Sequence, residues 1–446
     1  MLILILIFLS FFTIYVYKQA QLNLFAPNVI AGVIFIFYYL FDSIFCLIDS
    51  SKNPNFYLSN SFFTYTNTEQ IIIFTLASIS FWMLGDYLVG NFNNGTPNYD
   101  SFRNLKIQFR NSKLKYIRTI SLLTILVLFI ELLNFINFIN EFGGFNYYFD
   151  HIADRSLIFS EHTYFYALVQ ITTILGSIIA GYLIAIITTK KKTVYIISLT
   201  VLIIICILML SLLTGARANI LRPIIIMLVI SGYFGKKFVL RFRSFILAVG
   251  LIIALVLFSE ITRNNDTQEQ FNIFNNIFNS TEVSQINNLM VLEERNLVGL
   301  EDGKTIIAGL FSFIPDSIYR NFSIEKQLGG NAIFTEKVWP ERWERAKSEV
   351  ALGFLGESLM NFGFIISLLI FFVIGMFYRY LYKLLFIRKK GGIFGLLIYI
   401  GVVWSIFQLL RGDLYNTINT LFIYIISCIF SFGLLKITMW RVREKN

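Results

Sequence analysis

The chain has 446 residues, of which 56% are hydrophobic, 17% aromatic and 14% charged, and its mean hydropathy is +0.69. Soluble domains carry about a quarter charged residues, so this composition argues against a water-soluble globular protein, a disordered chain and a nucleic-acid-binding tail. The formal net charge is +10, and in so apolar a chain a basic excess bears first on orientation in a membrane. The three cysteines, Cys46, Cys206 and Cys428, lie within apolar runs, which is typical of small buried side chains rather than of disulfides or a metal site.

Eleven apolar runs are candidates for crossing a bilayer, whose hydrocarbon core of about 30 Å needs roughly 20 apolar residues per helix. The first run has no basic segment before it and no small-residue cleavage site, so we expect a retained span and not a signal peptide. The sequence therefore predicts an all-α polytopic membrane protein with about 11 transmembrane helices. The runs are residues 2–17, 27–48, 70–89, 117–139, 164–187, 194–213, 220–234, 245–261, 352–386, 393–410 and 414–435.

Basic residues cluster at every second connection between these runs. Such clusters mark the cytoplasmic face, so we expect the N-terminus outside and the C-terminus in the cytoplasm. The alternative, nucleic-acid binding, is disfavoured because the clusters are short, scattered and always at span ends. They fall at residues 103–118, 190–192, 236–243, 388–390 and 441–445.

The connections on the outer side are short except for 49–69, 140–163 and a segment at 263–349 that carries more acids than bases. We therefore expect residues 1–262 to hold spans 1–8, 263–349 to form a large extracytoplasmic loop of mixed helix and coil, and 350–446 to hold spans 9–11 and a short tail. Within the loop, Trp339 and Trp343 are four residues apart, which predicts a short helix with one aromatic face. Such a face is typical of the lipid headgroup level, and substrate stacking is the alternative.

Polar residues enter the apolar spans mainly at their outer ends. Because charges within a bilayer are costly, they usually face a cavity or a partner, so this pattern predicts a polar cavity on the outer side, covered by the long loop. The competing interpretation is that helix ends are wetter than helix middles and that these residues form local pairs. The residues are Glu131, Asn134, Arg217, Arg222, Glu260, Arg263, Glu357, Asn361, Gln408, Arg411 and Asp413.

Arginine suits a phosphate site because its planar fork donates paired hydrogen bonds and stays charged when partly desolvated. Four arginines, Arg217, Arg222, Arg263 and Arg411, are therefore candidates for holding a lipid-linked pyrophosphate. A carboxylate near them can take the proton of an attacking sugar hydroxyl; the candidates are Glu357 first, and then Glu260 or Asp413. Pyrophosphate is already a good leaving group, so the sequence predicts neither a cofactor nor a metal.

Three segments resemble the oligosaccharide repeat unit polymerases, the Wzy-type O-antigen polymerases: Leu-Thr-Gly-Ala-Arg-Ala-Asn-Ile-Leu at 213–221, Gly-Phe-Leu-Gly-Glu-Ser-Leu-Met-Asn-Phe-Gly-Phe at 353–364, and Arg-Gly-Asp-Leu-Tyr at 411–415. The resemblance implies a multi-pass glycosyltransferase of the bacterial cytoplasmic (inner) membrane that extends a polymer on undecaprenyl pyrophosphate at the outer face. It also implies an anion-binding role for Arg217 and Arg411, and an acceptor-side role for Glu357 and Asn361.

The leading hypothesis is therefore a polymerase that joins undecaprenyl-pyrophosphate-linked oligosaccharide repeat units into O-antigen or capsular polysaccharide, with a chain-length regulator as a further partner and no nucleic acid. One rival is an O-antigen ligase, which uses the same donor. A second rival, from another class, is a flippase or transporter of lipid-linked oligosaccharides. Transporters tend to have repeated halves and polar groups near the bilayer midplane, whereas here no internal repeat is evident and polar groups lie outward.

Overall fold

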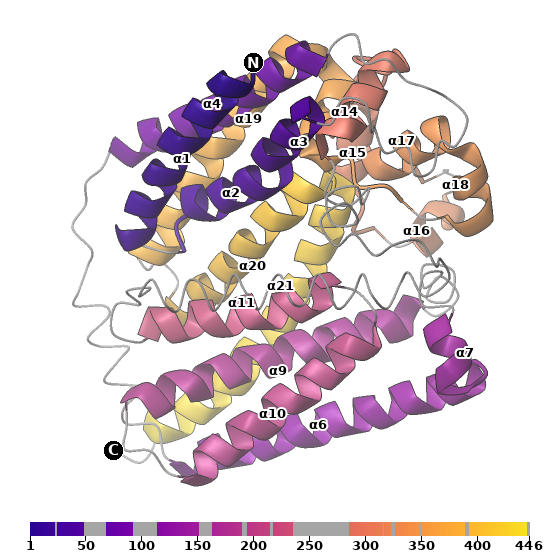
Figure 1. Ribbon diagram of the computed structural model, residues 1–446. Coiled ribbons are helices and arrows are strands. Elements are labelled where there is room, and N and C mark those ends of the chain that lie inside the picture. The colour runs from indigo at the N-terminus through magenta and orange to yellow at the C-terminus, as the bar shows by residue number, and fades with distance from the viewer. Residues whose placement is uncertain are drawn as a thin grey trace. The chain divides into compact units, whose positions relative to one another are not determined.

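The regular secondary structure that the computed structural model describes is entirely helical (Figure 1). An α-helix satisfies its own backbone hydrogen bonds, as an apolar segment in a bilayer requires. The described residues are 1–22, 25–48, 68–91, 114–150, 163–189, 194–214, 217–234, 285–314, 316–322, 326–347, 349–388 and 392–443.

Within these residues, nine helical segments are long and apolar enough to cross a membrane. They coincide with nine of the eleven predicted runs, which confirms a multi-pass α-helical membrane protein. Of the other two runs, 220–234 lies within α11 (Arg217–Phe234), a helix that is not among the nine. The run 245–261 lies outside the described residues.

The chain divides into two compact units. The first unit comprises Met1–Asn94, Glu260–Tyr382 and Ser405–Leu421, and the second comprises Gly95–Ser259, Lys383–Trp404 and Phe422–Asn446. The last two long helices contribute residues to both units: α20 (Gly392–Arg411) and α21 (Leu414–Arg443).

The first unit is built around a close pair of long helices, α4 and α19. A Cβ atom on Gly85 of α4 would lie 2.2 Å from the carbonyl oxygen of Phe372, and one on Gly375 of α19 would lie 2.3 Å from that of Trp82. Glycine at these positions lets the two backbones approach, as is common between membrane helices. Three long helices of this unit are α1 (Leu2–Leu22), α4 (Thr68–Asn91) and α19 (Gly353–Leu381). Three shorter segments follow one another without a gap: α2 (Pro27–Phe35), the π-helix η1 (Ile36–Leu40) and α3 (Phe41–Ile48).

Helix α19 is broken at Gly363, whose φ of 71° and ψ of −172° are not helical. Residues 353–362 therefore form a first half-helix, and the rest of α19 forms the second. The candidate span Gly353–Ile387 has 35 residues, about 52 Å at 1.5 Å per residue, which exceeds the hydrocarbon core of about 30 Å. The break explains this excess, because residues 364–387 reach about 36 Å and are long enough alone.

The break also exposes helix carbonyls, which backbone N–H groups of the segment that precedes α19 then satisfy. The backbone N–H groups of Gly299 and Glu301 donate to the carbonyls of Leu359 and Met360, at 3.0 and 3.2 Å. The described part of this segment is a mixture of short helices and loops, as the sequence predicts. Its helices are α14 (Gln285–Glu294), α15 (Lys304–Leu310), α16 (Asp316–Asn321), α17 (Gly330–Val338) and α18 (Pro340–Ala346).

The short helix that was predicted from two tryptophans is present as α18, but only Trp343 belongs to it. The helix begins at Pro340, since proline is favoured at the first helical position, and Trp339 precedes it as the N-cap. The ring of Trp339 packs edge-on against Phe334 of α17, with ring centroids 5.4 Å apart. The helix itself therefore holds one of the two tryptophans, and the other packs against α17.

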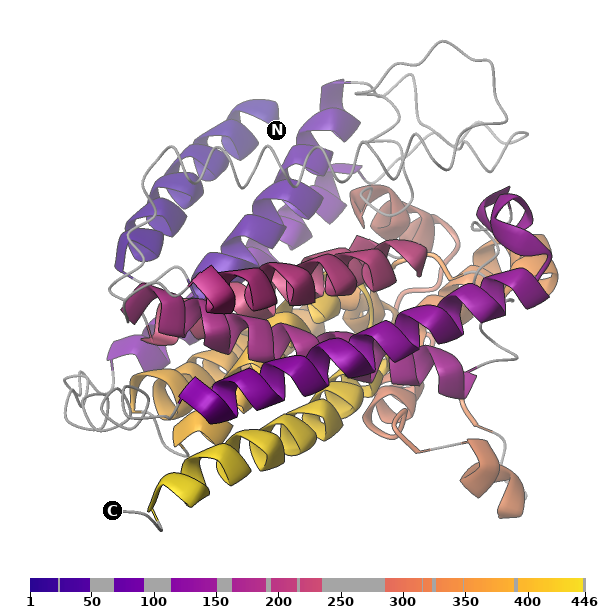
Figure 2. The same cartoon turned by 90° about the horizontal axis from the view of Figure 1, so that it is seen from below.

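The second unit contains long helices that lie side by side, with α6, α9 and α10 adjacent in both views (Figure 1, Figure 2). The hydroxyl of Tyr148 in α7 donates to the carbonyl of Leu213 at 2.6 Å, which ties α7 to the end of α10. Its remaining helices are α6 (Leu114–Glu141), α7 (Gly144–Asp150), α9 (Thr163–Thr189), α10 (Val194–Leu213) and α11 (Arg217–Phe234).

Candidate functional site

The structure describes most, but not all, of the predicted site residues. Glu260 and Arg263 lie outside the described residues, and for Arg217 only the backbone is described, as the first residue of α11. Five of the others lie in the first unit, at the start of α19, at the end of α20 and in the turn before α21: Glu357, Asn361, Gln408, Arg411 and Asp413. Three others lie in the second unit: Glu131, Asn134 and Arg222.

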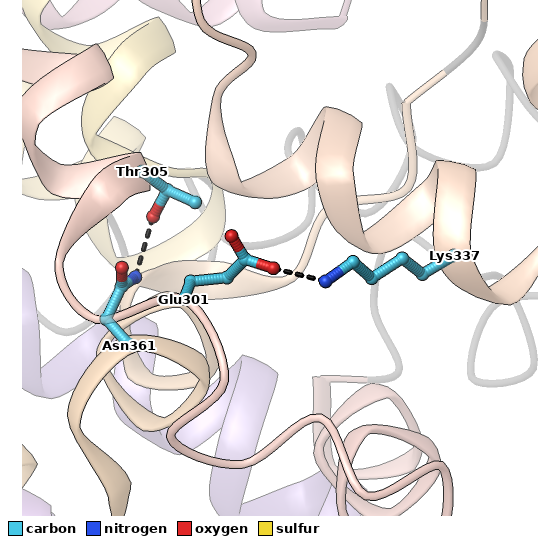
Figure 3. A network of polar contacts seen from close by, with 4 residues as sticks. All are labelled: Glu301, Thr305, Lys337 and Asn361. Atoms are coloured by element: carbon cyan, nitrogen blue, oxygen red, sulfur yellow. Dashed lines mark hydrogen bonds and ion pairs between the residues drawn. The ribbon is translucent and has the colours of Figure 1, made fainter.

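Glu357 and Asn361 lie one turn apart in the first half of α19, and both are buried. The Asn361 side-chain amide donates to the Thr305 hydroxyl at 2.7 Å (Figure 3). It also donates to the Glu357 backbone carbonyl at 2.6 Å. The Thr305 hydroxyl in turn donates to Glu357 Oε1 at 3.0 Å. Because the two residues are four apart, both reach Thr305, and the three hydrogen bonds join the first half of α19 to α15.

Asp413 lies in the turn between α20 and α21 and is fully buried. Its Oδ1 accepts the backbone N–H of Asn416 at 2.9 Å, which is the geometry of an N-cap for α21. Its Oδ2 accepts the backbone N–H of Asn331 from α17 at 3.0 Å. Glu357 Oε2 accepts the backbone N–H of Leu414, the first residue of α21, at 2.7 Å. Two carboxylates therefore occupy the N-terminus of α21, where the helix dipole favours negative charge.

A third carboxylate, Glu349, belongs to this group and was missed in the sequence. Its Oε2 accepts the side-chain amide of Asn416 at 2.9 Å. Surrounding protein atoms displace water from its carboxylate and Asp413 lies close by, which together raise the pKa of Glu349 to about 7, although the side chain keeps an exposed surface. Burial also raises the pKa of Asp413 above its ordinary value. We call Glu349, Glu357 and Asp413 the carboxylate cluster.

Two consecutive glycines bring α17 against this cluster. A Cβ atom on Gly330 would lie 2.8 Å from Glu357 Cγ, and one on Gly329 would lie 2.9 Å from Asp413 Oδ2. Asn331, the next residue, accepts the backbone N–H of Leu352 at 2.9 Å through its Oδ1. The only sequence signal for this approach is the Gly-Gly-Asn run, which by itself reads as an ordinary turn.

An ion pair between α17 and the loop before α15 lies beside the cluster. Lys337 Nζ of α17 contacts Glu301 Oε1, and Figure 3 shows the pair beside Thr305 and Asn361. Because the backbone of Glu301 also bonds to α19, this pair links α17 to the loop that covers the first half-helix.

Arg411 is the last residue of α20 and lies two residues before Asp413. Its guanidinium carbon is 6.0 Å from the ring centroid of Phe407, and the residue is half-buried. A second cation, Lys326, lies 5.6 Å from the ring centroid of Tyr415 just beyond the same turn and donates to the Ile314 carbonyl at 3.1 Å. Basic groups therefore accompany the carboxylate cluster at this turn.

Arg222 of α11 lies in a separate environment in the second unit. It is only 5% exposed, donates to Gln170 Oε1 at 3.1 Å and has its guanidinium carbon 5.1 Å from the ring of Trp404. Within the described part of the chain it forms no ion pair, and its Nε has no acceptor. A buried guanidinium with these neighbours is suited to an anionic ligand, because an uncompensated buried charge is costly.

Glu131 and Asn134 are in α6 of the second unit, where Glu131 is buried and Asn134 is exposed. The sequence assigned all these polar groups to one cavity. Among the described residues, those of α19 and those of the α20–α21 turn lie together. Glu357 accepts a hydrogen bond from Leu414, and Asp413 accepts one from Asn331, so both carboxylates contact segments that are distant in the sequence.

Among the described residues, no group of three histidine, cysteine, aspartate or glutamate side chains is arranged to hold a metal ion. The two histidines, His151 and His162, lie outside that part of the chain. No protein-family model, curated protein or solved structure matches this chain significantly.

The hydrogen bonds assign different chemical capacities to the three carboxylates. Both oxygens of Glu357 and of Asp413 accept protein donors, mainly backbone N–H groups, so these side chains hold α15, α17 and α21 together. Glu349 is the member of the cluster with an exposed side chain. It is therefore the carboxylate best placed to exchange a proton with a group arriving from outside the protein.

Proposed function

We propose that this protein is a membrane glycosyltransferase that polymerises undecaprenyl-pyrophosphate-linked oligosaccharide repeat units into O-antigen or capsular polysaccharide at the outer face of the bacterial cytoplasmic membrane. The observation that carries the proposal is the hydrogen bond from the Leu414 N–H to Glu357 Oε2. It joins two of the three segments that resemble the repeat unit polymerases, 353–364 and 411–415, in one buried polar cluster.

The reaction needs orientation, charge stabilisation and a proton acceptor. A hydroxyl at the non-reducing end of one lipid-linked repeat unit attacks the anomeric carbon of the growing glycan. The bond to pyrophosphate breaks, undecaprenyl pyrophosphate leaves with the electron pair, and the hydroxyl proton passes to a carboxylate. Arg411 is proposed to bind the pyrophosphate near the cluster, with Arg217, Arg222 and Arg263 as further anion-binding residues.

The contacts of the cluster support a division of labour among its carboxylates. Glu357 and Asp413 are proposed as positioning residues, because their oxygens are occupied by protein donors. Glu349 is proposed as the proton acceptor, because it is exposed and its pKa is raised to about 7, close to the pH at which a general base works best.

A second candidate function, transport of a lipid-linked oligosaccharide, is favoured by the broken helix α19. Discontinuous membrane helices are typical of transporter binding sites. An O-antigen ligase, which uses the same donor, is a third candidate. The polar residues of α19 precede the break at Gly363 and so lie toward one end of the span, which favours a transferase.

Deleting the gene and examining the surface glycan separates the three. Loss of a polymerase leaves single repeat units on the surface acceptor, loss of a ligase leaves polymer on the carrier lipid, and loss of a flippase leaves units inside the cell. Complementation with the wild-type gene is the control. Either of the last two results would overturn the proposal.

A further inference from the structure

Helix α15 turns an apolar face away from the protein. Its buried face includes Thr305 and Gly309, whereas Ile307, Leu310 and the following Phe311 are 53%, 51% and 49% exposed. A helix at the surface of a soluble protein shows the opposite pattern, with its polar residues outward. Large exposed apolar patches mark contacts with a partner or a membrane.

The packing of its buried face fixes the level of α15 along the neighbouring spans. A Cβ atom on Gly309 would lie 2.9 Å from Leu414 Cβ, and Thr305 Oγ1 lies 3.0 Å from Glu357 Oε1. Leu414 begins a candidate span of 20 residues, Leu414–Gly433, about the length that crosses the hydrocarbon core. Leu414 is therefore the end residue of this candidate span, and α15, which contacts it, lies at the same level.

The group that covers this face must then be one found at the edge of the bilayer. We propose that α15 is an interfacial helix whose side chains Ile307, Leu310 and Phe311 contact lipid acyl chains. The exposed Lys304 at its first turn suits the phosphate of a lipid headgroup.

This placement has a consequence for the carboxylate cluster. Thr305, on the inner face of α15, donates to Glu357, so a helix seated among lipids holds one wall of the cluster at the headgroup level. A substrate whose tail is in the bilayer presents its headgroup at that level. The inference itself depends only on the exposed face and its depth, and it stands or falls separately from the proposed function.

Photolabelling of the unmodified chain tests the proposal. The full-length protein is reconstituted into vesicles of phosphatidylcholine that carries a diazirine in one acyl chain, irradiated, digested and mapped by mass spectrometry. We expect adducts within residues 307–313, as on the exposed span residues Ile429 and Phe430, and none around the exposed Glu336 of α17. Labelling of α21 without labelling of 307–313 would overturn the proposal.

Spin labelling provides an independent measurement of what covers this face. Leu310→Cys is compared with Ile429→Cys as the lipid-facing control and Glu336→Cys as the water-facing control, in a background without the native cysteines. We expect the label at 310 to be relaxed by oxygen, as at 429, and not by a nickel chelate, as at 336. Relaxation mainly by nickel would place the helix in water, and protection from both reagents would show a covering protein such as a second copy; each result contradicts lipid contact.

Discussion

Glu357 Oε2 accepts the backbone N–H of Leu414 at 2.7 Å, so a side chain in the second turn of α19 satisfies the first residue of α21, 57 positions later. This single bond joins the beginnings of two membrane spans. Its strength rests on burial, because a hydrogen bond to a charged or strongly polar acceptor gains from a low local dielectric, and an orphaned donor there is costly.

Removing this acceptor is expected to destabilise the fold. Glu357→Ala leaves the Leu414 N–H and the Thr305 hydroxyl without their acceptor, at a cost of about 1–3 kcal/mol for each buried group left unsatisfied. Thermal unfolding in detergent measures the effect. Glu336→Ala, at an exposed position of α17, is the control, and an equal melting temperature for the two variants would contradict the prediction.

Stability is expected to fall as the pH rises through neutrality, because of Glu349. Its pKa is raised to about 7, above the unfolded value of about 4.3, so the folded state holds the proton more tightly. The stabilisation is complete below pH 4 and is lost as the pH rises through about 7. Asp413, with its pKa also raised, contributes with the same sign.

Glu349→Gln tests this dependence, because glutamine resembles the protonated acid and does not ionise. We expect the variant and the wild type to melt alike near pH 4, and the variant to melt higher near pH 8. Glu336→Gln, at an exposed position of α17, serves as the control. A constant difference between Glu349→Gln and the wild type across this range would rule out the raised pKa.

The break in α19 is expected to require glycine. Gly363 has a φ of 71° and a ψ of −172°, and an added Cβ atom would have no neighbour within 4 Å, so Gly363→Ala acts through the backbone alone. Strain of this kind costs about 1–3 kcal/mol. Gly433→Ala in α21 likewise meets no neighbour but has no positive φ, so it is expected not to destabilise, because alanine favours a helix interior over glycine. Equal unfolding curves for both variants would show that the break is not strained.

The contact between α4 and α19 is expected to be intolerant of a single methyl group. Gly375→Ala places a Cβ atom 2.3 Å from the carbonyl oxygen of Trp82, so the helices must separate, and overpacking of this kind typically costs about 1–3 kcal/mol. Gly90→Ala on α4 is the matched control, because its nearest neighbours are Arg379 side-chain atoms at 3.6 Å. The ratio of folded to aggregated protein after solubilisation measures the effect, and equal recovery would contradict it.

The proposed function predicts that arginine is required where phosphate is bound. Arg217→Ala and Arg411→Ala are expected to fold yet to abolish long polymer, and Arg411→Lys is expected to restore only short chains, because lysine lacks the planar fork. The ladder of surface glycan on a gel measures chain length, with the protein level in the membrane as the control. Wild-type chain lengths in both alanine variants would remove these residues from the site.

The sequence by itself determined the class of this protein. Nine of the eleven predicted spans are helices of suitable length among the described residues, because the tendency of a segment to cross a bilayer is a sum over neighbouring residues and needs no knowledge of its partners. The same local reasoning identified Glu357 and Asp413, since acids at the edge of an apolar run stand out in any context.

Only the tertiary structure decided what these residues contact. Glu349, Asn331 and Gly330 were missed, because each lies in a polar segment where acids, amides and glycines are ordinary, and their meeting with Glu357 and Asp413 depends on packing between segments far apart in the chain. The break at Gly363 was missed because a lone glycine in an apolar run is compatible with a continuous helix. Burial and long-range hydrogen bonds leave no periodic trace in a sequence, so the cluster became visible only in the fold.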